Sequence, residues 1–184
     1  MNESVLECGR PGKGSRSAIE ERCYDFLDSL NIEYTRVDHE AAATMEALHE
    51  AEHVLGCRIA KNLFLTNRQQ TEFYLLIMTG DKSFKTKYLS AQLGCSRLSF
   101  ASEELLTEKL SVHSGSASIL TLIDAQSEHL TLVIDKDLCS EKTFACHPCI
   151  NTSTVAFSFD ALNEKLIPAL RFEPFYVELP QNPE

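Results

Sequence analysis

The sequence lacks the features that mark several large classes of protein. Its 184 residues include no apolar run of 18 or more, the length that a membrane-spanning helix needs. Residues 1–17 lack the apolar stretch of a secretory signal, so we expect a cytosolic protein. Neither GxGxxG nor GxxxxGK(S/T) occurs, which disfavours a doubly wound nucleotide-binding fold. GxSxG is absent as well, so hydrolysis by this chain would have to use water directly.

Cysteine is present, but in an arrangement that disfavours a disulfide scaffold. The seven cysteines form an odd, scattered set in a chain long enough to fold without crosslinks. Cys146 and Cys149 form a CxxC pair around His147, which leaves a redox pair or half of a zinc site as an alternative. A structural zinc needs about two further ligands at matching spacing, and the other cysteines occur singly. The sequence therefore predicts no metal and no cofactor.

The composition is that of one soluble globular domain, with an uneven distribution of charge. Hydrophobic residues make up 43% and charged residues 24% of the chain, and the net charge is −10. Residues 1–57 carry 5 basic and 12 acidic groups and residues 98–184 carry 5 and 13, whereas residues 58–97 carry 7 and 2. The seven basic residues of this middle segment are Arg58, Lys61, Arg68, Lys82, Lys85, Lys87 and Arg97. If they converge on one face, they form a salt-sensitive phosphate site suited to the end of a nucleic acid; if they scatter, they are ordinary solvated surface.

Hydrophobic spacing and capping residues predict a mixture of helices and strands after a mobile tail. Residues 1–16 contain three glycines and a proline, so we expect them to be mobile and residues 17–180 to form a single domain. Helices are predicted at 17–30, 44–56, 84–93, 102–110 and 160–170. Strands are predicted at 32–38, 61–66, 72–79, 97–100, 119–124, 130–135 and 172–179. Two pairs, 61–66 with 72–79 and 119–124 with 130–135, are predicted to form hairpins.

The order of these elements indicates the fold class. Several hairpins and few strand–helix–strand alternations favour an α+β domain over a doubly wound one. No internal repeat is visible, which disfavours a solenoid or propeller. We expect a single domain with one mixed, strongly curved, barrel-like sheet surrounded by helices.

Four places in the chain could carry chemistry. Lys61 lies where an amphipathic segment meets the apolar strand KNLFL, so its stem should pack while its ammonium points into a cleft; the alternative is a strand-end lysine with its ammonium in water. His147 lies in the irregular CHPCINT stretch and His39 follows the first predicted strand, and each could equally be a structural histidine. The small residues of 114–118 allow the backbone to approach a ligand closely, although a plain turn has the same composition.

An ordered series of motifs resembles one known family. The motifs are LNIEYTRVDHEAAATMEAL, AKNLFL, TGDKSFKTKYLSAQLG, RLSFASEELL, VHSGSAS, LVIDKDL and HPCINTSTVAFS. Together, over residues 18–178, they resemble the bacterial YbaK/prolyl-tRNA-synthetase-associated-domain family. Within it the chain is most similar to the stand-alone prolyl-tRNA editing proteins, which hydrolyse alanine, or in other branches cysteine, serine or threonine, wrongly attached to the proline tRNA.

The resemblance implies roles for particular residues. Lys61 matches the active-site lysine, Gly115 opens the loop usually written GxxxP, and His147 matches the histidine of the HPxxNT motif. The residues expected to bind substrate are Asn62, His39, Thr44, Ser116, Ser118, Asn151 and Thr152. The residues expected to contact tRNA are Arg58, Lys82, Lys85 and Lys87. Ile119 departs from the family pattern, which often has proline there, so the rigidity of the loop and the accepted amino acid are open.

The function implied by the resemblance is hydrolysis of an aminoacyl ester at the 3′ end of tRNA. Such an ester is already activated and needs a positioned water and a stabilised oxyanion, with assistance from the terminal ribose hydroxyl. The implied substrate is a small amino acid, alanine first, on mischarged tRNA(Pro). Prolyl-tRNA synthetase or an elongation factor is a further candidate partner, and neither membrane nor DNA is expected. The alternative within the same fold is a non-catalytic module that binds RNA or the synthetase.

Overall fold

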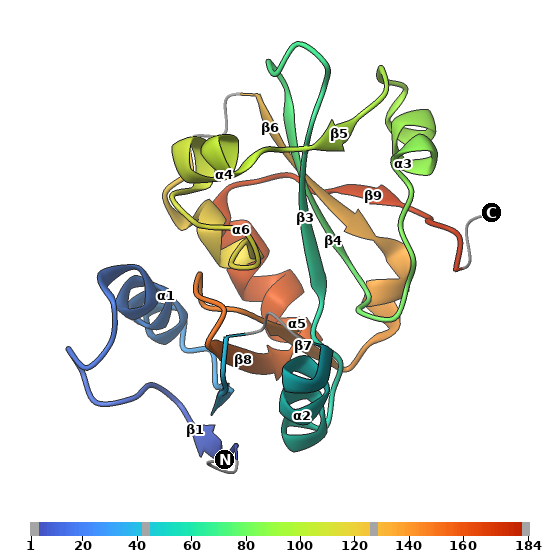
Figure 1. The fold of residues 1–184 in the computed structure, drawn as a ribbon. Helices are drawn as coiled ribbons and strands as arrows, with labels where there is room; N and C mark the ends of the chain where they lie inside the picture. The colour runs from blue at the N-terminus through green and yellow to red at the C-terminus, as the bar shows by residue number, and fades with distance from the viewer. Residues whose placement is uncertain (1–3, 42–44, 126–128, 182–184) are drawn as a thin grey trace.

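The computed structural model describes residues 4–41, 45–125 and 129–181, and their strands form two sheets (Figure 1). The four-stranded sheet is antiparallel, in the order β1 (Leu6–Cys8), β2 (Thr35–Asp38), β8 (Ser153–Ser158) and β7 (Thr143–Cys146). The five-stranded sheet has the order β5 (Ser99–Phe100), β3 (Lys61–Thr66), β4 (Phe73–Met78), β6 (Leu130–Asp135) and β9 (Phe175–Val177). This second sheet is mixed, because β6 runs parallel to both β4 and β9.

The two sheets meet at one short seam. Ile59, just before β3, forms a parallel bridge with Ala145 in β7, and the backbone N–H of Ala60 donates to the Ala145 carbonyl at 2.9 Å. The predicted mixed α+β class is confirmed. The described strands form two sheets joined at this seam, in place of the single strongly curved, barrel-like sheet that the sequence led us to expect, because only an isolated bridge connects them.

The helices surround these sheets close to where the sequence predicts them (Figure 1). Their bounds are α1 (Ala18–Ser29), α2 (Met45–Leu55), α3 (Thr86–Leu93) and α4 (Glu103–Leu110), followed by the helical run α5 (Phe159–Ala161), η3 (Leu162–Leu166) and α6 (Ile167–Leu170). The Ser17 hydroxyl accepts from the Glu20 backbone N–H at the start of α1, as the predicted N-cap requires. Gly94 ends α3 at φ 64°, the left-handed conformation that glycine adopts without strain.

One predicted hairpin is confirmed and the other is wrong. β3 and β4 pair antiparallel, from Lys61 opposite Met78 to Thr66 opposite Phe73. Residues 119–123, predicted as a strand, form the 3-10 helix η1 (Ile119–Ile123), whose first turn is capped by the Ser118 hydroxyl. The error has a physical reason: the first four residues of η1 are buried, and a short apolar run does not distinguish a buried strand from a buried helical turn. A second short helix, η2 (Lys136–Ser140), follows β6.

The N-terminal segment makes specific contacts with the domain. Within residues 1–16, where the sequence led us to expect a tail, β1 pairs antiparallel with β2. Arg10 forms ion pairs with Glu21, with Asp25 at 2.6 Å and with Asp28 at 3.2 Å, all on α1. Among the residues described, no helix is long and apolar enough to cross a membrane.

Apolar side chains cover both faces of the five-stranded sheet. Along β4, Leu75 and Ile77 belong to the main core, which also receives α1, α4 and α6. Tyr74, Leu76 and Met78 belong to a second cluster that includes Leu89 of α3. Because neighbouring strand residues point to opposite faces, a continuous apolar run such as β4 must be covered on both sides. α3 therefore packs against one face of the five-stranded sheet. The first residue of β3 lies next to the seam.

Candidate active site

Two chain segments that carry predicted catalytic residues lie side by side at the seam. The parallel bridge joins Ile59 to Ala145, and Lys61 and His147 each lie two residues further along their own segment. Lys61 is the first residue of β3 and is partly exposed, and its ammonium donates to the backbone carbonyl of Lys82 at 2.7 Å. Within the residues that the structure describes, the ammonium makes this one hydrogen bond, which leaves two of its three N–H groups for a ligand.

His147 is buried and has one ring nitrogen committed to the protein. Its Nδ1 atom lies 2.9 Å from the Ser153 carbonyl oxygen and 3.1 Å from the Thr154 hydroxyl. Because a carbonyl oxygen can only accept, we assign the ring proton to Nδ1, which leaves Nε2 as an acceptor. Burial lowers the pKa of His147 to about 4, so the ring is neutral at neutral pH. A neutral ring whose Nε2 carries a lone pair can accept a hydrogen bond from a hydroxyl or a water.

Thr154 connects this histidine to the second predicted one. The His39 Nε2 atom lies 2.9 Å from the Thr154 hydroxyl, and its Nδ1 atom lies 2.8 Å from the Glu40 carbonyl oxygen. The same argument assigns the His39 proton to Nδ1, so the Thr154 hydroxyl accepts from His147 and donates to His39. The two rings are 5.7 Å apart between centroids. His147, Thr154 and His39 therefore form one hydrogen-bonded chain, the histidine chain.

Thr154 was not among the site residues predicted from the sequence. Thr154 lies in β8, where it is fully buried and is paired in register with Val37 of β2, two residues before His39. A buried hydroxyl requires a hydrogen-bond partner, so the threonine that precedes the apolar residues Val155, Ala156 and Phe157 was the available signal.

The small-residue loop approaches the segment that follows His147. Gly115 has φ 81°, a conformation that favours glycine, and a Cβ atom at this position would lie 3.9 Å from Nδ2 of Asn151. Ser116 is buried, and its backbone N–H donates to the His113 carbonyl at 3.0 Å in a turn. Ser118 is also buried, and its hydroxyl accepts from the Leu120 backbone N–H at 3.0 Å. This hydrogen bond caps η1, so the Ser118 side chain has a structural role.

The remaining predicted substrate residues have separate positions. The side-chain N–H of Asn62 donates to the Ala60 carbonyl at 2.9 Å, while its Oδ1 atom is buried without a hydrogen-bond partner among the residues that the structure describes. Thr152 is exposed, and its carbonyl accepts from the His39 backbone N–H at 3.0 Å. Asn151 is partly exposed beside the Gly115 loop. Thr44 lies outside the described residues.

The predicted tRNA contacts divide into surface and buried residues. Arg58 is 63% exposed and lies 4.0 Å from Asp81, and Lys85 and Lys87 are exposed at the start of α3. Lys82 is 0% exposed, which corrects its expected role as a surface contact for tRNA. Its ammonium lies 2.5 Å from Asp135 and 2.7 Å from Asp137. Burial opposes the charge, but the two carboxylates outweigh it and raise the pKa of Lys82, so the lysine remains an internal cation.

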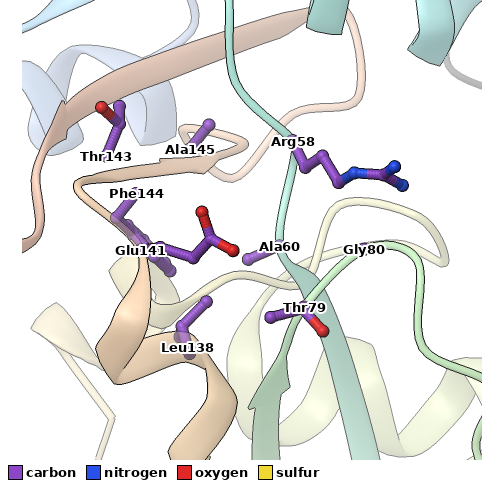
Figure 2. Close-up of a pocket in the computed structure, with 9 residues that line it drawn as sticks. All are labelled: Arg58, Ala60, Thr79, Gly80, Leu138, Glu141, Thr143, Phe144 and Ala145. Carbon is purple, nitrogen blue, oxygen red and sulfur yellow. The ribbon is translucent and has the colours of Figure 1, made fainter. Parts of the chain in front are cut away.

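A small pocket lies at the seam beside Ala60 and Ala145 (Figure 2). Its volume is about 10 Å³, which holds about one water molecule and no amino acid. Figure 2 shows the Arg58 side chain directed away from this pocket and Glu141 and Thr79 beside it. A Cβ atom on Gly80, which also lines the pocket, would lie 2.4 Å from the Ile59 carbonyl oxygen. The absence of a side chain at Gly80 therefore allows the β4–α3 loop to pack closely against the segment that enters β3.

Both cysteines of the CxxC pair are buried. Cys149 and Cys23 lie 3.4 Å apart between their sulfur atoms, and burial raises the pKa of the Cys146 thiol to about 12. Thiols that stay protonated at neutral pH are poor nucleophiles and poor metal ligands. Within the part of the chain that the structure describes, no group of three or more His, Cys, Asp or Glu side chains is arranged to hold a metal ion.

Comparison with known proteins identifies the family of the chain. The family model described as the aminoacyl-tRNA editing domain matches residues 39–164. The "Prolyl-tRNA editing protein ProX" of Acetoanaerobium sticklandii is 32% identical over 143 residues, which cover 78% of this chain and 87% of that protein. The "Prolyl-tRNA synthetase associated domain-containing protein 1" of Danio rerio is 32% identical over 161 residues, 85% of each chain.

Solved structures share the fold at low sequence identity. A crystal structure described as a candidate trans-editing enzyme for prolyl tRNA synthetase superposes with a TM-score of 0.66 at 16% identity, covering 90% of this chain and 100% of that one. A scaffold protein used for epitope grafting gives a TM-score of 0.68 at 13% identity, covering 91% and 99%. The resemblance seen in the sequence motifs is thus confirmed. The chain belongs to the aminoacyl-tRNA editing domain family and is an aminoacyl-tRNA deacylase, a hydrolase that cleaves the ester between an amino acid and tRNA.

Proposed function

We propose that this deacylase acts in trans on tRNA(Pro) and removes a small, wrongly attached amino acid, alanine first. The proposal rests on one observation: the Lys61 ammonium is held by the Lys82 carbonyl at the seam where the His147 segment runs alongside. A bacterial relative named as a prolyl-tRNA editing protein supports the choice of tRNA. The substrate is therefore mischarged tRNA(Pro), which Arg58, Lys85 and Lys87 would contact from the exposed surface.

The chemistry requires no protein nucleophile. A water molecule adds to the ester carbonyl, the ester C–O bond breaks, and the products are the free amino acid and the tRNA with its terminal ribose hydroxyl restored. The two uncommitted N–H groups of Lys61 would bind the carbonyl oxygen as it gains negative charge, or a terminal phosphate oxygen. A charge held in place before the reaction stabilises the transition state without reorganisation.

The histidine chain would orient the reacting hydroxyl groups. The Nε2 acceptor of His147 can take a hydrogen bond from the terminal ribose hydroxyl or from the water, with the ribose assisting attack. Backbone groups around Gly115 would hold the aminoacyl part, since a glycine at φ 81° allows close approach. Asn62, with its buried and unpartnered Oδ1, would accept from the substrate ammonium.

Selection by size would explain the choice of a small amino acid. A hydrophobic pocket distinguishes side chains that differ by one methylene by only about 10- to 200-fold, so a synthetase that accepts alanine needs a second site to remove it. A second site that admits alanine and excludes the proline ring supplies that step. Delivery by prolyl-tRNA synthetase or by an elongation factor, in the cytosol, is part of the proposal.

The test is release of labelled alanine from Ala-tRNA(Pro) by the purified chain. We expect Lys61→Ala to lower kcat at least about 100-fold, the effect of removing one oxyanion donor. Lys142→Ala, which removes an exposed lysine far along the chain, is the matched control and should keep full activity. Correctly charged Pro-tRNA(Pro) should be spared.

The same assay separates the alternatives. Faster deacylation of Ser-tRNA(Pro) or Cys-tRNA(Pro) than of Ala-tRNA(Pro) would keep the mechanism and reject alanine as the substrate. Binding of tRNA without turnover of any of the three would reject the catalytic proposal and favour the non-catalytic binding module.

A further inference from the structure

A surface groove between α3 and β5 combines aromatic rings with positive charge. Its lining residues are Phe84, Lys85, Thr86, Lys87, Ser90, Arg97 and Phe100, and its volume is about 660 Å³. This volume lies within the range of small-ligand sites. α3 and β5 lie close together at one side of the five-stranded sheet (Figure 1), and the Leu98 backbone N–H donates to the Ser90 hydroxyl at 3.1 Å between them.

The aromatic part of the groove is unusually exposed. Phe100 lies on the edge strand β5 and is 60% exposed. Its ring meets that of Phe84 edge-on, with centroids 6.0 Å apart and an interplanar angle of 76°. Phe84 is anchored in turn by the apolar cluster around Leu89. A supported ring with much of its surface in water is a platform on which a nucleobase can stack, and stacking is worth about 1–3 kcal/mol per base in single-strand-binding proteins.

The charged part of the groove suits a phosphate backbone. Three lining residues, Lys85, Lys87 and Arg97, are basic, and no acidic residue appears among the described residues that line it. The whole chain carries a net charge of −10, so this local excess of positive charge contrasts with the rest of the molecule. Aromatic rings interleaved with lysine and arginine are the usual composition of sites for unpaired nucleic acid.

The groove lies within reach of the Lys61 site. Phe100 pairs in register with Leu65, four residues along β3 from Lys61, which corresponds to about 13 Å along a strand. Phe84 is also two residues beyond Lys82, whose carbonyl binds the Lys61 ammonium. Stacked nucleotides advance about 3.4 Å each, so an unpaired strand of about four nucleotides covers this distance.

We propose that this groove binds the unpaired 3′ strand of the tRNA, with one base stacked on Phe100 and the phosphates held by Lys85, Lys87 and Arg97. The inference rests on the proposed function, because it assumes that the terminal ribose occupies the Lys61 site. It adds a defined contact for the nucleotides that precede that ribose, and it makes Phe100 a binding residue that acts through stacking.

Direct binding can be measured without any deacylation. The chain contains no tryptophan, so Phe100→Trp introduces a single fluorescent reporter into the groove. Titration with a short single-stranded RNA of the acceptor-end sequence should quench this fluorescence. Three phosphate contacts predict a slope of about −2 in a plot of log affinity against log salt. Phe175→Trp, at a 44% exposed position on β9, is the matched control and should not respond.

Two results would overturn the groove proposal. One is the absence of quenching at position 100; the other is equal affinity for an oligonucleotide without a base at the stacked position, which would leave charge alone as the cause of binding. Because this titration needs no turnover, it stays decisive even if no mischarged tRNA is hydrolysed, and the two proposals can fail separately.

Kinetics provide a second readout. Phe100→Ala should raise KM for mischarged tRNA by about 5- to 150-fold with kcat unchanged, while Phe100→Tyr keeps the wild-type KM. Hydrolysis of aminoacyl-adenosine, which lacks the preceding nucleotides, should be unaffected by either change. A loss of kcat on both substrates would contradict a stacking role.

Discussion

His147 couples the chemistry of the site to the stability of the fold through its protonation state. The pKa of His147 falls from 6.5 to about 4 on folding, because burial disfavours the imidazolium, and nearby His39 opposes that charge as well. The ring is therefore neutral over the pH range in which an editing enzyme works, and its Nδ1 proton is engaged with Ser153. Only Nε2 is left for the substrate.

This residue should make stability fall in acid. Above pH 6.5 the ring is neutral in both the folded and the unfolded chain, so its full contribution is present. As the pH falls from 6.5 to 4, the unfolded chain binds the proton and the folded chain does not, so the free energy of unfolding decreases by about 3 kcal/mol. Urea unfolding at pH 7, 5.5 and 4 measures this change.

His147→Asn is the informative variant, because its amide N–H can replace Nδ1–H without titrating. We expect this variant to lose about 3 kcal/mol less than the wild type between pH 7 and pH 4. His49→Asn, at an exposed histidine in α2, is the matched control for the substitution. Identical pH profiles for wild type and His147→Asn would contradict the argument.

At the scale of elements, the loop between β4 and α3 depends on an internal ion pair. Lys82 and Asp135 are both 0% exposed and lie 2.5 Å apart, which joins the loop to the end of β6. The carbonyl of the same Lys82 binds the Lys61 ammonium at 2.7 Å. In the proposed mechanism Lys82 is thus a positioning residue: its side chain holds the loop while its backbone carbonyl binds the ammonium of Lys61.

Lys82→Met should destabilise the fold by about 3–5 kcal/mol, because it leaves the buried Asp135 carboxylate without its partner. Urea unfolding at neutral pH measures the loss. Lys85→Met, an exposed lysine in the same loop, should change stability by less than about 0.5 kcal/mol. Equal stability of the two variants would show that the buried pair is dispensable. The double variant Lys82→Met, Asp135→Leu should recover most of the lost stability, since both charges are then absent.

At the scale of the whole molecule, the candidate active site lies between two sheets. Lys61 belongs to the five-stranded sheet, whereas the histidine chain begins next to β7 and ends after β2, in the four-stranded sheet. The bridge between Ile59 and Ala145 joins the two sheets, and one apolar core includes side chains of both, such as Leu75 of β4 and Phe157 of β8. We therefore expect activity to depend more on the relative position of the two sheets than on the stability of either sheet.

Gly80→Ala tests this dependence. The new Cβ atom would lie 2.4 Å from the Ile59 carbonyl oxygen, so the backbone at the seam must move. We expect a loss of about 1–3 kcal/mol in stability, as for overpacked cores, together with a lower kcat on mischarged tRNA. Gly12→Ala, where a Cβ atom meets nothing within 4 Å, is the control for both measurements. Wild-type activity in Gly80→Ala would mean that the seam tolerates displacement.

The features that could be predicted from the amino-acid sequence are local, or depend on a series of motifs. Ser17 and Gly94 predicted helix ends, and the apolar runs around the first hairpin predicted its strands, because caps and strand pairs of this kind depend on residues a few positions apart. The ordered motifs also pointed to the family. The apolar run at 119–124 was wrongly predicted as a strand, although its first five residues form a 3-10 helix. Apolar composition alone does not distinguish a buried strand from a buried helical turn.

Which charges are buried and which side chains share a site could be seen in the folded structure and could not be predicted from the sequence. Lys82 is 53 positions from Asp135, and His39 is 115 positions from Thr154, so neither contact leaves a signal in local spacing. Phe84 and Phe100 likewise form one groove only because β5 pairs with β3 beside α3. Such contacts depend on how the whole chain packs. A single sequence contains both residues of each contact but gives no indication that they lie close together in the fold.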